Sequence, residues 1–97
     1  METQLEDKLK IILGHFAELE LKLAEAGSDY QLVAELSKER SELEPVVNLA
    51  QQYNAAHSQL EETKALLGSA EGEMRELAEQ ELQELSEQLD RVQAELR

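Results

Sequence analysis

Five glutamates lie between residues 69 and 82, in the stretch SAEGEMRELAEQEL, and such a group of carboxylates could do two kinds of chemistry. Paired carboxylates can serve as general acid and base, or they can bind a divalent cation through their oxygens. Both tasks require several carboxylates to converge in a concave site that holds little water. The position of the glutamates relative to the apolar residues of the same segment therefore decides the interpretation.

The apolar residues of this segment recur at helical spacing and leave the glutamates to one side. They form the stripe Met74, Ala78, Leu82, Leu85, Leu89, Val92 and Leu96. The carboxylates off this stripe are Glu73, Glu76, Glu79, Glu81, Glu84 and Glu87. Because the two sets occupy different faces of one helix, we predict that these glutamates face solvent and form no catalytic or metal site.

The two histidines, His15 and His57, are the other candidates for metal or acid–base chemistry. They fall on different predicted helices, and two imidazoles without a third ligand at suitable spacing make an incomplete zinc site. His57 lies on an apolar seam and is predicted to be a half-buried core residue. The glycines are too dispersed for a phosphate-binding loop, and the chain has no cysteine. The sequence thus predicts no catalytic residue, no metal site and no cofactor.

Three segments carry apolar stripes of helical periodicity. The first stripe is Leu5, Leu9, Ile12, Phe16, Leu19 and Leu23, and the third is the one given above. The second is Leu32, Leu36, Leu43, Val46, Ala50, Tyr53, His57, Leu60 and Leu67, with Glu39 and Lys64 as polar interruptions. Between the first two, Gly27 fits a left-handed turn and Ser28 or Asp29 can cap the next helix. Gly68 is predicted to end the second helix.

These patterns predict an all-α fold, an antiparallel three-helix bundle with coiled-coil-like packing, in a single helical domain over residues 1–97. The connections are short, which favours antiparallel neighbours. Pro45 lies inside the second helix, where it removes one amide donor and crowds the carbonyl of Ser41, at a cost of about 3 kcal/mol unless the helix bends. Because the apolar register continues past it, we expect a long central helix kinked near Pro45.

A second, smaller apolar face is present on the first predicted helix. Gly14, Ala17, Leu21 and Ala24 step by three and four residues on the side opposite the main stripe. One interpretation is that scattered alanine and leucine on a surface have no role, because much of any protein surface is apolar. The alternative is a partner-binding strip, a surface on which another helix or domain docks.

The charge balance limits the kinds of partner. The chain has 22 acidic and 9 basic side chains, a net charge of −13. A polyanion would bind against this repulsive field, so we expect no direct nucleic-acid binding by the isolated domain. Apolar runs such as IIL at 11–13 are far shorter than the roughly 18 residues that cross a bilayer, so no membrane partner is expected. The absence of cysteine fits a reducing compartment, and the predicted localisation is cytoplasmic.

Three strings of residues resemble a known family. SDYQLVAELSKERSELEPVV at 28–47, LEETKALL at 60–67 and GEMRELAEQEL at 72–82, with Tyr53 between the first two, resemble the N-terminal helical domain of bacterial class I peptide chain release factors. The string EMRELA is closer to the release factor 1 branch, which reads the stop codons UAA and UAG. The family often has an Asp-Pro pair ahead of this string, whereas this chain has GSAEG, so its second turn is expected to differ.

The resemblance implies a non-catalytic interaction and positioning domain that acts in translation termination. In the family, peptidyl-tRNA hydrolysis and codon reading belong to domains downstream of this one, so both are expected to be absent from these 97 residues. The implied partners, in the context of the full-length factor, are the ribosome, through large-subunit stalk-base proteins, and a partner GTPase. The alternative is a structural coiled-coil protein that dimerises or tethers through the same heptads and is unrelated to translation.

Overall fold

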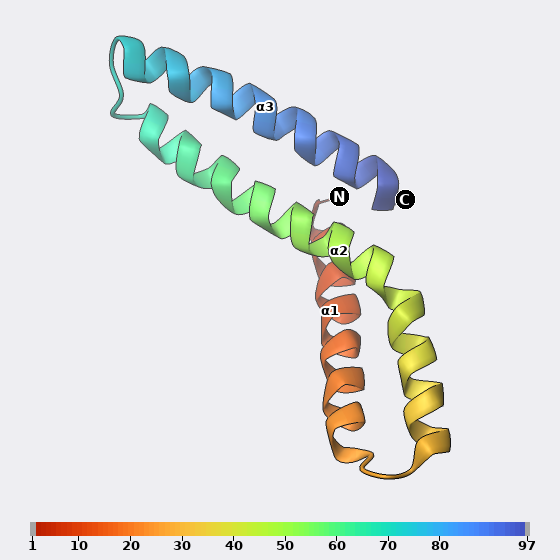
Figure 1. Cartoon of the computed structure of the whole chain (residues 1–97). Helices are drawn as coiled ribbons and strands as arrows, with labels where there is room; N and C mark the ends of the chain where they lie inside the picture. The colour runs from red at the N-terminus through yellow and green to blue at the C-terminus, as the bar shows by residue number, and fades with distance from the viewer. Residues whose placement is uncertain (1, 97) are drawn as a thin grey trace. The chain divides into compact units, whose positions relative to one another are not determined.

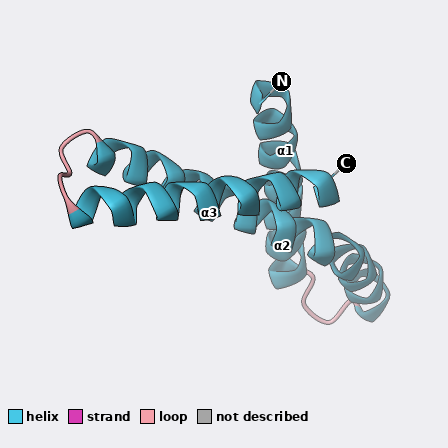
Figure 2. Ribbon diagram, turned by 90° about the horizontal axis from the view of Figure 1, so that it is seen from above, coloured by secondary structure: helices cyan, strands magenta, loops and turns pink. Residues whose placement is uncertain are grey.

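The computed structural model describes residues 2–96, with the side chains of residues 4–96, and this part of the chain is built from three helices. They are α1 (Glu2–Glu25), α2 (Tyr30–Leu67) and α3 (Glu73–Leu96) (Figure 1). Figure 2 shows helix along the described chain except at two short connections, and residues 2–96 contain no strand. The predicted all-α fold with three helices packed antiparallel is confirmed.

The helices form two compact units, each of which is an antiparallel hairpin. The first hairpin ends at Ala50 and pairs α1 with the first part of α2, and the second hairpin begins at Gln51 and pairs the rest of α2 with α3 (Figure 1). The expectation that residues 1–97 behave as one domain stays a prediction.

Local chemistry explains the connection in the first hairpin. Gly27 has a φ of 59°, the left-handed conformation that glycine adopts without a steric penalty. Asp29 then caps α2, because its Oδ1 accepts a hydrogen bond from the amide of Leu32 at 3.1 Å, which satisfies one of the unpaired N–H groups of the first turn. The predicted roles of Gly27 and of the cap are confirmed, and the geometry selects Asp29 over Ser28.

The second connection is closed by an arginine. α2 ends at Leu67 and is followed by Gly68, as predicted, but the positive φ of this turn, 61°, belongs to Gly72. Nη1 of Arg75, in the first turn of α3, donates to the carbonyl oxygen of Leu67 at 3.3 Å. This contact satisfies one of the end carbonyls that a helix leaves without an internal partner.

The core of the first hairpin agrees with the predicted stripes except at two places. Its buried residues are Leu9, Leu19, Leu36, Val47 and Ala50. Val47 was not on the predicted seam, which had assigned its neighbour Val46. The prediction for Leu32 was wrong, because this residue is 39% exposed in the first turn of α2, where little of α1 remains beside it.

The core of the second hairpin contains several small side chains. Its buried residues are Tyr53, Ala56, Leu60, Thr63, Ala78, Leu85, Leu89 and Val92. The seam passes through Thr63 beside the predicted interruption at Lys64, because a real helix has 3.6 residues per turn and drifts against a strict heptad. Met74, predicted on the third stripe, is 59% exposed, because it lies in the first turn of α3 where the paired helix α2 has almost ended.

α2 runs without interruption through Pro45, which lies in its interior. The continuous helix agrees with the unbroken apolar register, and the bend expected at Pro45 stays a prediction. Within the described residues, none of the three helices is both long and apolar enough to cross a membrane.

Candidate partner-binding surface

The predicted partner-binding strip lies on the exposed side of α1. Its four residues, Gly14, Ala17, Leu21 and Ala24, are all exposed, and Leu21 is 61% exposed. A Cβ added at Gly14 would meet no neighbouring atom within 4 Å. The strip therefore lies outside the core of the hairpin, as its position on the helix requires. Its role in binding a partner stays a prediction.

Sequence reasoning missed one large apolar residue beside the strip. Ile11 is 71% exposed and precedes Gly14 by three residues, a spacing that makes the two positions neighbours on the helix surface. The signal was present in the run IIL at 11–13, because three consecutive apolar residues cannot all face one partner helix. Ile12 and Leu13 are half-buried, so Ile11 is the one that faces outward.

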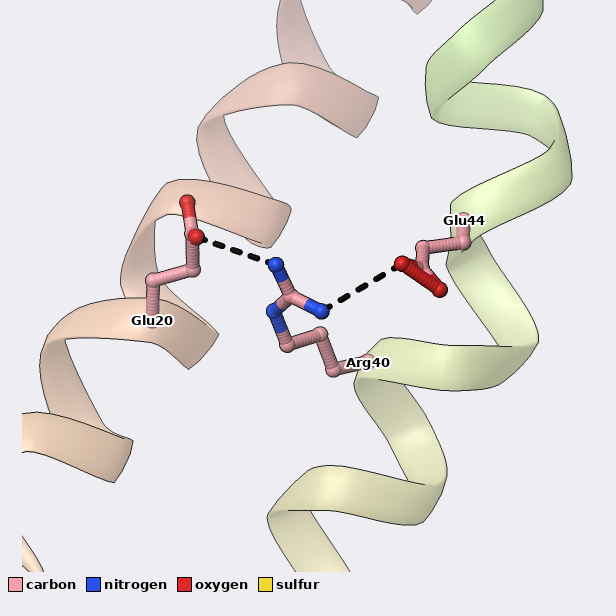
Figure 3. A network of polar contacts seen from close by, with 3 residues as sticks. All are labelled: Glu20, Arg40 and Glu44. Carbon is pink, nitrogen blue, oxygen red and sulfur yellow. Dashed lines mark hydrogen bonds and ion pairs between the residues drawn. The ribbon is translucent and has the colours of Figure 1, made fainter.

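A cluster around Arg40 connects α1 with α2. From α2, Nη2 of Arg40 donates to Oε2 of Glu20 on α1 at 3.2 Å, and Nη1 donates to Oε1 of Glu44 at 3.4 Å (Figure 3). The guanidinium carbon also lies 4.7 Å from the centre of the Phe16 ring, within the range of a cation–π contact. Phe16 lies on the side of α1 that contacts α2, and the exposure of all four strip residues shows that the partner-binding strip is turned away from α2.

Each histidine contacts residues of its own hairpin. Nε2 of His15 lies 2.9 Å from Oε1 of Glu39 across the first hairpin, and the imidazole is the donor because a carboxylate only accepts. His57 is half-buried, as predicted, and stacks on Tyr53 with 5.8 Å between ring centroids. Its Nε2 also lies 4.0 Å from Oε1 of Glu61. Among the residues that the structure describes, no group of three or more His, Cys, Asp or Glu is placed to hold a metal ion.

The acidic face of α3 is the other exposed surface with a distinct chemistry. The six glutamates predicted to face solvent are all exposed, which confirms that prediction. Glu79 is paired with Arg75, whose Nε lies 3.2 Å from Oε1 of that carboxylate. α3 carries eight acidic residues and two arginines, a net charge of −6. This helix therefore produces a negative field that favours basic partners and repels acidic ones.

Comparison with known proteins now identifies the family. The PCRF domain matches residues 12–97, which include most of α1 and the full lengths of α2 and α3. The protein Peptide chain release factor 1 of Finegoldia magna is 38% identical over 94 residues, and that of Agathobacter rectalis is 33% identical over 94 residues. No solved structure matches the chain significantly.

The extent of these matches limits what they say about this chain. Each alignment covers 94% of this chain but 26% of the relative, so the chain spans about a quarter of the length of these proteins. The family is a non-catalytic helical domain of release factors. The resemblance carried by residues 28–47, 60–67 and 72–82 is therefore confirmed, and the chain belongs to the PCRF domain family.

Proposed function

We propose that this chain is the N-terminal interaction and positioning domain of a peptide chain release factor that acts in translation termination at UAA and UAG in the cytoplasm. The observation that carries the proposal is the PCRF match over residues 12–97, together with two relatives named Peptide chain release factor 1. In such a factor the chain supplies no chemistry. It holds the remainder of the protein in place on the ribosome through contacts with large-subunit stalk-base proteins and a partner GTPase.

The partner-binding strip on α1 is the surface proposed for docking within this assembly. It offers small side chains at Gly14, Ala17 and Ala24, which let another helix approach closely, and one large apolar anchor at Leu21. Such an anchor gains free energy when a partner covers it, about 25 cal/mol per Å² of apolar surface removed from water. We propose that another helix or domain of the longer factor, or of a ribosome-bound partner, lies on this strip.

A chimera tests the proposed function. This chain replaces the matching 94-residue segment of the Finegoldia magna relative, and peptide release is measured on ribosomes programmed with UAA or UAG. We expect the chimera to keep most of the release rate, whereas the relative without that segment releases slowly. A folded chimera that releases no faster than the shortened relative would contradict the proposal.

The same chimera tests the strip. Leu21→Glu places a charge on the proposed docking surface and should slow release. Gln4→Glu is the matched control, because Gln4 is also exposed on α1 and the substitution changes the net charge by the same amount. Equal release by both variants would remove the strip from the proposal.

Sedimentation of the 97-residue chain addresses the alternative of a coiled-coil dimer. In each hairpin the apolar seam of α2 is already covered by a helix of the same chain, so a monomer is expected at micromolar concentration. A stable dimer in which the apolar seam of α2 is buried between two chains would favour the structural coiled-coil protein over the release-factor domain.

A further inference from the structure

Three apolar side chains are exposed at the turn end of the second hairpin. Leu66, in the last turn of α2, is 54% exposed, and Met74 and Leu77, at the start of α3, are each 59% exposed. The connection between α2 and α3 places all three at the same end of the hairpin (Figure 1). We call these residues the α3 tip patch.

The pairing geometry places the α3 tip patch along one edge of the hairpin. Leu66 comes one residue before the inward-facing Leu67, and Leu77 comes one residue before the buried Ala78. In an antiparallel pair of helices, positions displaced in the same sense from the two seams flank the same edge. Leu66 and Leu77 therefore lie on one side, with Met74 between the seam and Leu77.

A shallow hollow adjoins the patch on α3 and is lined by Glu73, Glu76, Leu77 and Gln80. Their spacing of three, four and seven residues puts them on one face of the helix. Within the described residues neither Glu73 nor Glu76 has a cationic partner, in contrast to Glu79, which pairs with Arg75. A leucine between two carboxylates of this kind suits a lysine or arginine, whose aliphatic stem packs on apolar surface while its charge reaches the acids.

Charge decides the class of the occupant. Nucleic acid and anionic membrane surfaces are both negative, and a second copy of the chain carries a net charge of −13. All three would approach α3, with its net charge of −6, against a repulsive field. A basic protein segment would be attracted by the same field, and its apolar residues would cover the exposed leucines.

We propose that the α3 tip patch, with Glu73 and Glu76, docks a basic amphipathic segment of another protein. The inference rests on the proposed function in one respect, namely that the chain meets the partner protein on the ribosome. The patch supplies the apolar contact, and the two carboxylates select lysine or arginine beside it.

The first test uses a synthetic helical peptide of leucine and lysine as the probe, with affinity measured by fluorescence anisotropy and the contact residues by amide NMR shifts of the 97-residue chain. The largest shifts are expected within residues 66–80. Leu77→Gln should weaken binding about tenfold, which corresponds to about 1.4 kcal/mol, because the variant loses an apolar contact with the peptide. Tyr30→Gln is the control, since it removes an exposed apolar side chain from the first hairpin. Shifts centred on the first hairpin, or equal loss in both variants, would overturn the proposal.

A matched pair of charge variants separates the site from general attraction. Glu73→Gln with Glu76→Gln should weaken peptide binding, whereas Glu84→Gln with Glu87→Gln, the same charge change further along α3, should leave it nearly unchanged. Equal weakening by both pairs would overturn the proposal, because any acidic surface would then suffice. These assays do not depend on termination activity. If the chimera fails in peptide release but the peptide binds at residues 66–80, only the proposed function is contradicted. If the chimera works but the peptide does not bind there, only this inference is contradicted.

Discussion

The two hairpins bring their helices together with different side-chain chemistry. In the first, charged groups span the two helices, with Arg40 contacting Glu20 and Phe16 of α1, and Glu39 bonded to His15. In the second, the ion pairs of the described residues, such as that between Arg75 and Glu79, run along a single helix, although Arg75 also reaches the Leu67 carbonyl of α2 at the turn. Its seam is instead lined with small buried side chains at Ala56, Thr63 and Ala78, which allow close helix approach.

This difference shows which carboxylates of each hairpin are available to a partner. Exposed ion pairs contribute only about 0–1 kcal/mol, so the cross-helix ion pairs of the first hairpin add little to its stability. They also engage the carboxylates of Glu20 and Glu39, and Arg40 engages that of Glu44 along α2. In the second hairpin Glu73 and Glu76 are not engaged by a cation within the described residues, and they stand beside the exposed Leu77. The start of α3 thus offers an external basic group carboxylates together with an apolar contact.

The largest expected effect comes from truncating the two cores in turn. Leu19→Ala in the first hairpin and Leu89→Ala in the second should each lower the free energy of unfolding by about 2–5 kcal/mol, because both side chains are buried. Both variants are made with Tyr30→Phe, which leaves the buried Tyr53 as the only tyrosine and so as a reporter of the second hairpin. Urea unfolding is followed by tyrosine fluorescence and by circular dichroism.

The same data test whether residues 1–97 form one domain. If they do, Leu19→Ala shifts the transition seen by Tyr53 as much as the transition seen by circular dichroism, because the two probes coincide in two-state unfolding. A Tyr53 transition that stays in place while half of the helix signal is lost would mean that the hairpins unfold separately. Each hairpin would then have its own free energy of unfolding, and the two values could be compared.

A smaller effect is expected from removing the cross-helix cation of the first hairpin. Arg40→Met should lower the free energy of unfolding by about 1 kcal/mol, since it removes two partly exposed ion pairs and a cation–π contact. Lys38→Met makes the same charge change at an exposed position two residues earlier. Its free energy of unfolding should stay within about 0.5 kcal/mol of that of the unchanged chain. Chemical denaturation measures the free energy of unfolding of both variants. An equal loss in the two would show that the charge at these positions matters and that the contacts of Arg40 do not.

Much of the fold could be predicted because it depends on local patterns. The cap at Asp29, the left-handed Gly27 and the outward-facing glutamates of α3 all follow from residue type and spacing. Met74 could not be placed, because its exposure depends on where the neighbouring helix ends. Contacts such as that of Arg40 with Glu20 also could not be predicted, because the relative register of two helices is set by the turn and by packing as a whole. Ile11 is a different case, because the apolar run at 11–13 already required one of its residues to face outward.

A modest effect is expected from salt. The first hairpin has eleven acidic and five basic residues, a net charge of −6, and the second has eleven and four, a net charge of −7. Raising ionic strength from a low value to about 0.15 M shortens the screening length to about 8 Å, which relieves repulsion more than it weakens exposed ion pairs. The Tm should therefore rise.

The rise should depend more on α3 than on α1, because α3 has twice the net negative charge, −6 against −3 from six acids and three lysines. Glu84→Gln with Glu87→Gln should flatten the salt dependence more than Glu18→Gln with Glu25→Gln. Thermal melts at several salt concentrations measure this. A Tm that falls with added salt would mean that the ion pairs outweigh the repulsion.

The smallest expected effect is that of Leu21→Glu on stability. Leu21 is exposed, and a charge at an exposed position leaves no group buried without a partner, so the free energy of unfolding should change by no more than about 0.5 kcal/mol. Leu19→Glu, two residues earlier, provides the contrast, because Leu19 is 1% exposed and burying an unpaired carboxylate is strongly unfavourable. Thermal melts of the two variants should therefore separate a nearly unchanged protein from an unfolded one. If Leu21→Glu also collapsed the fold, the first hairpin would depend on the outer side of α1 as well as its seam, and that side could not serve as a surface for a partner.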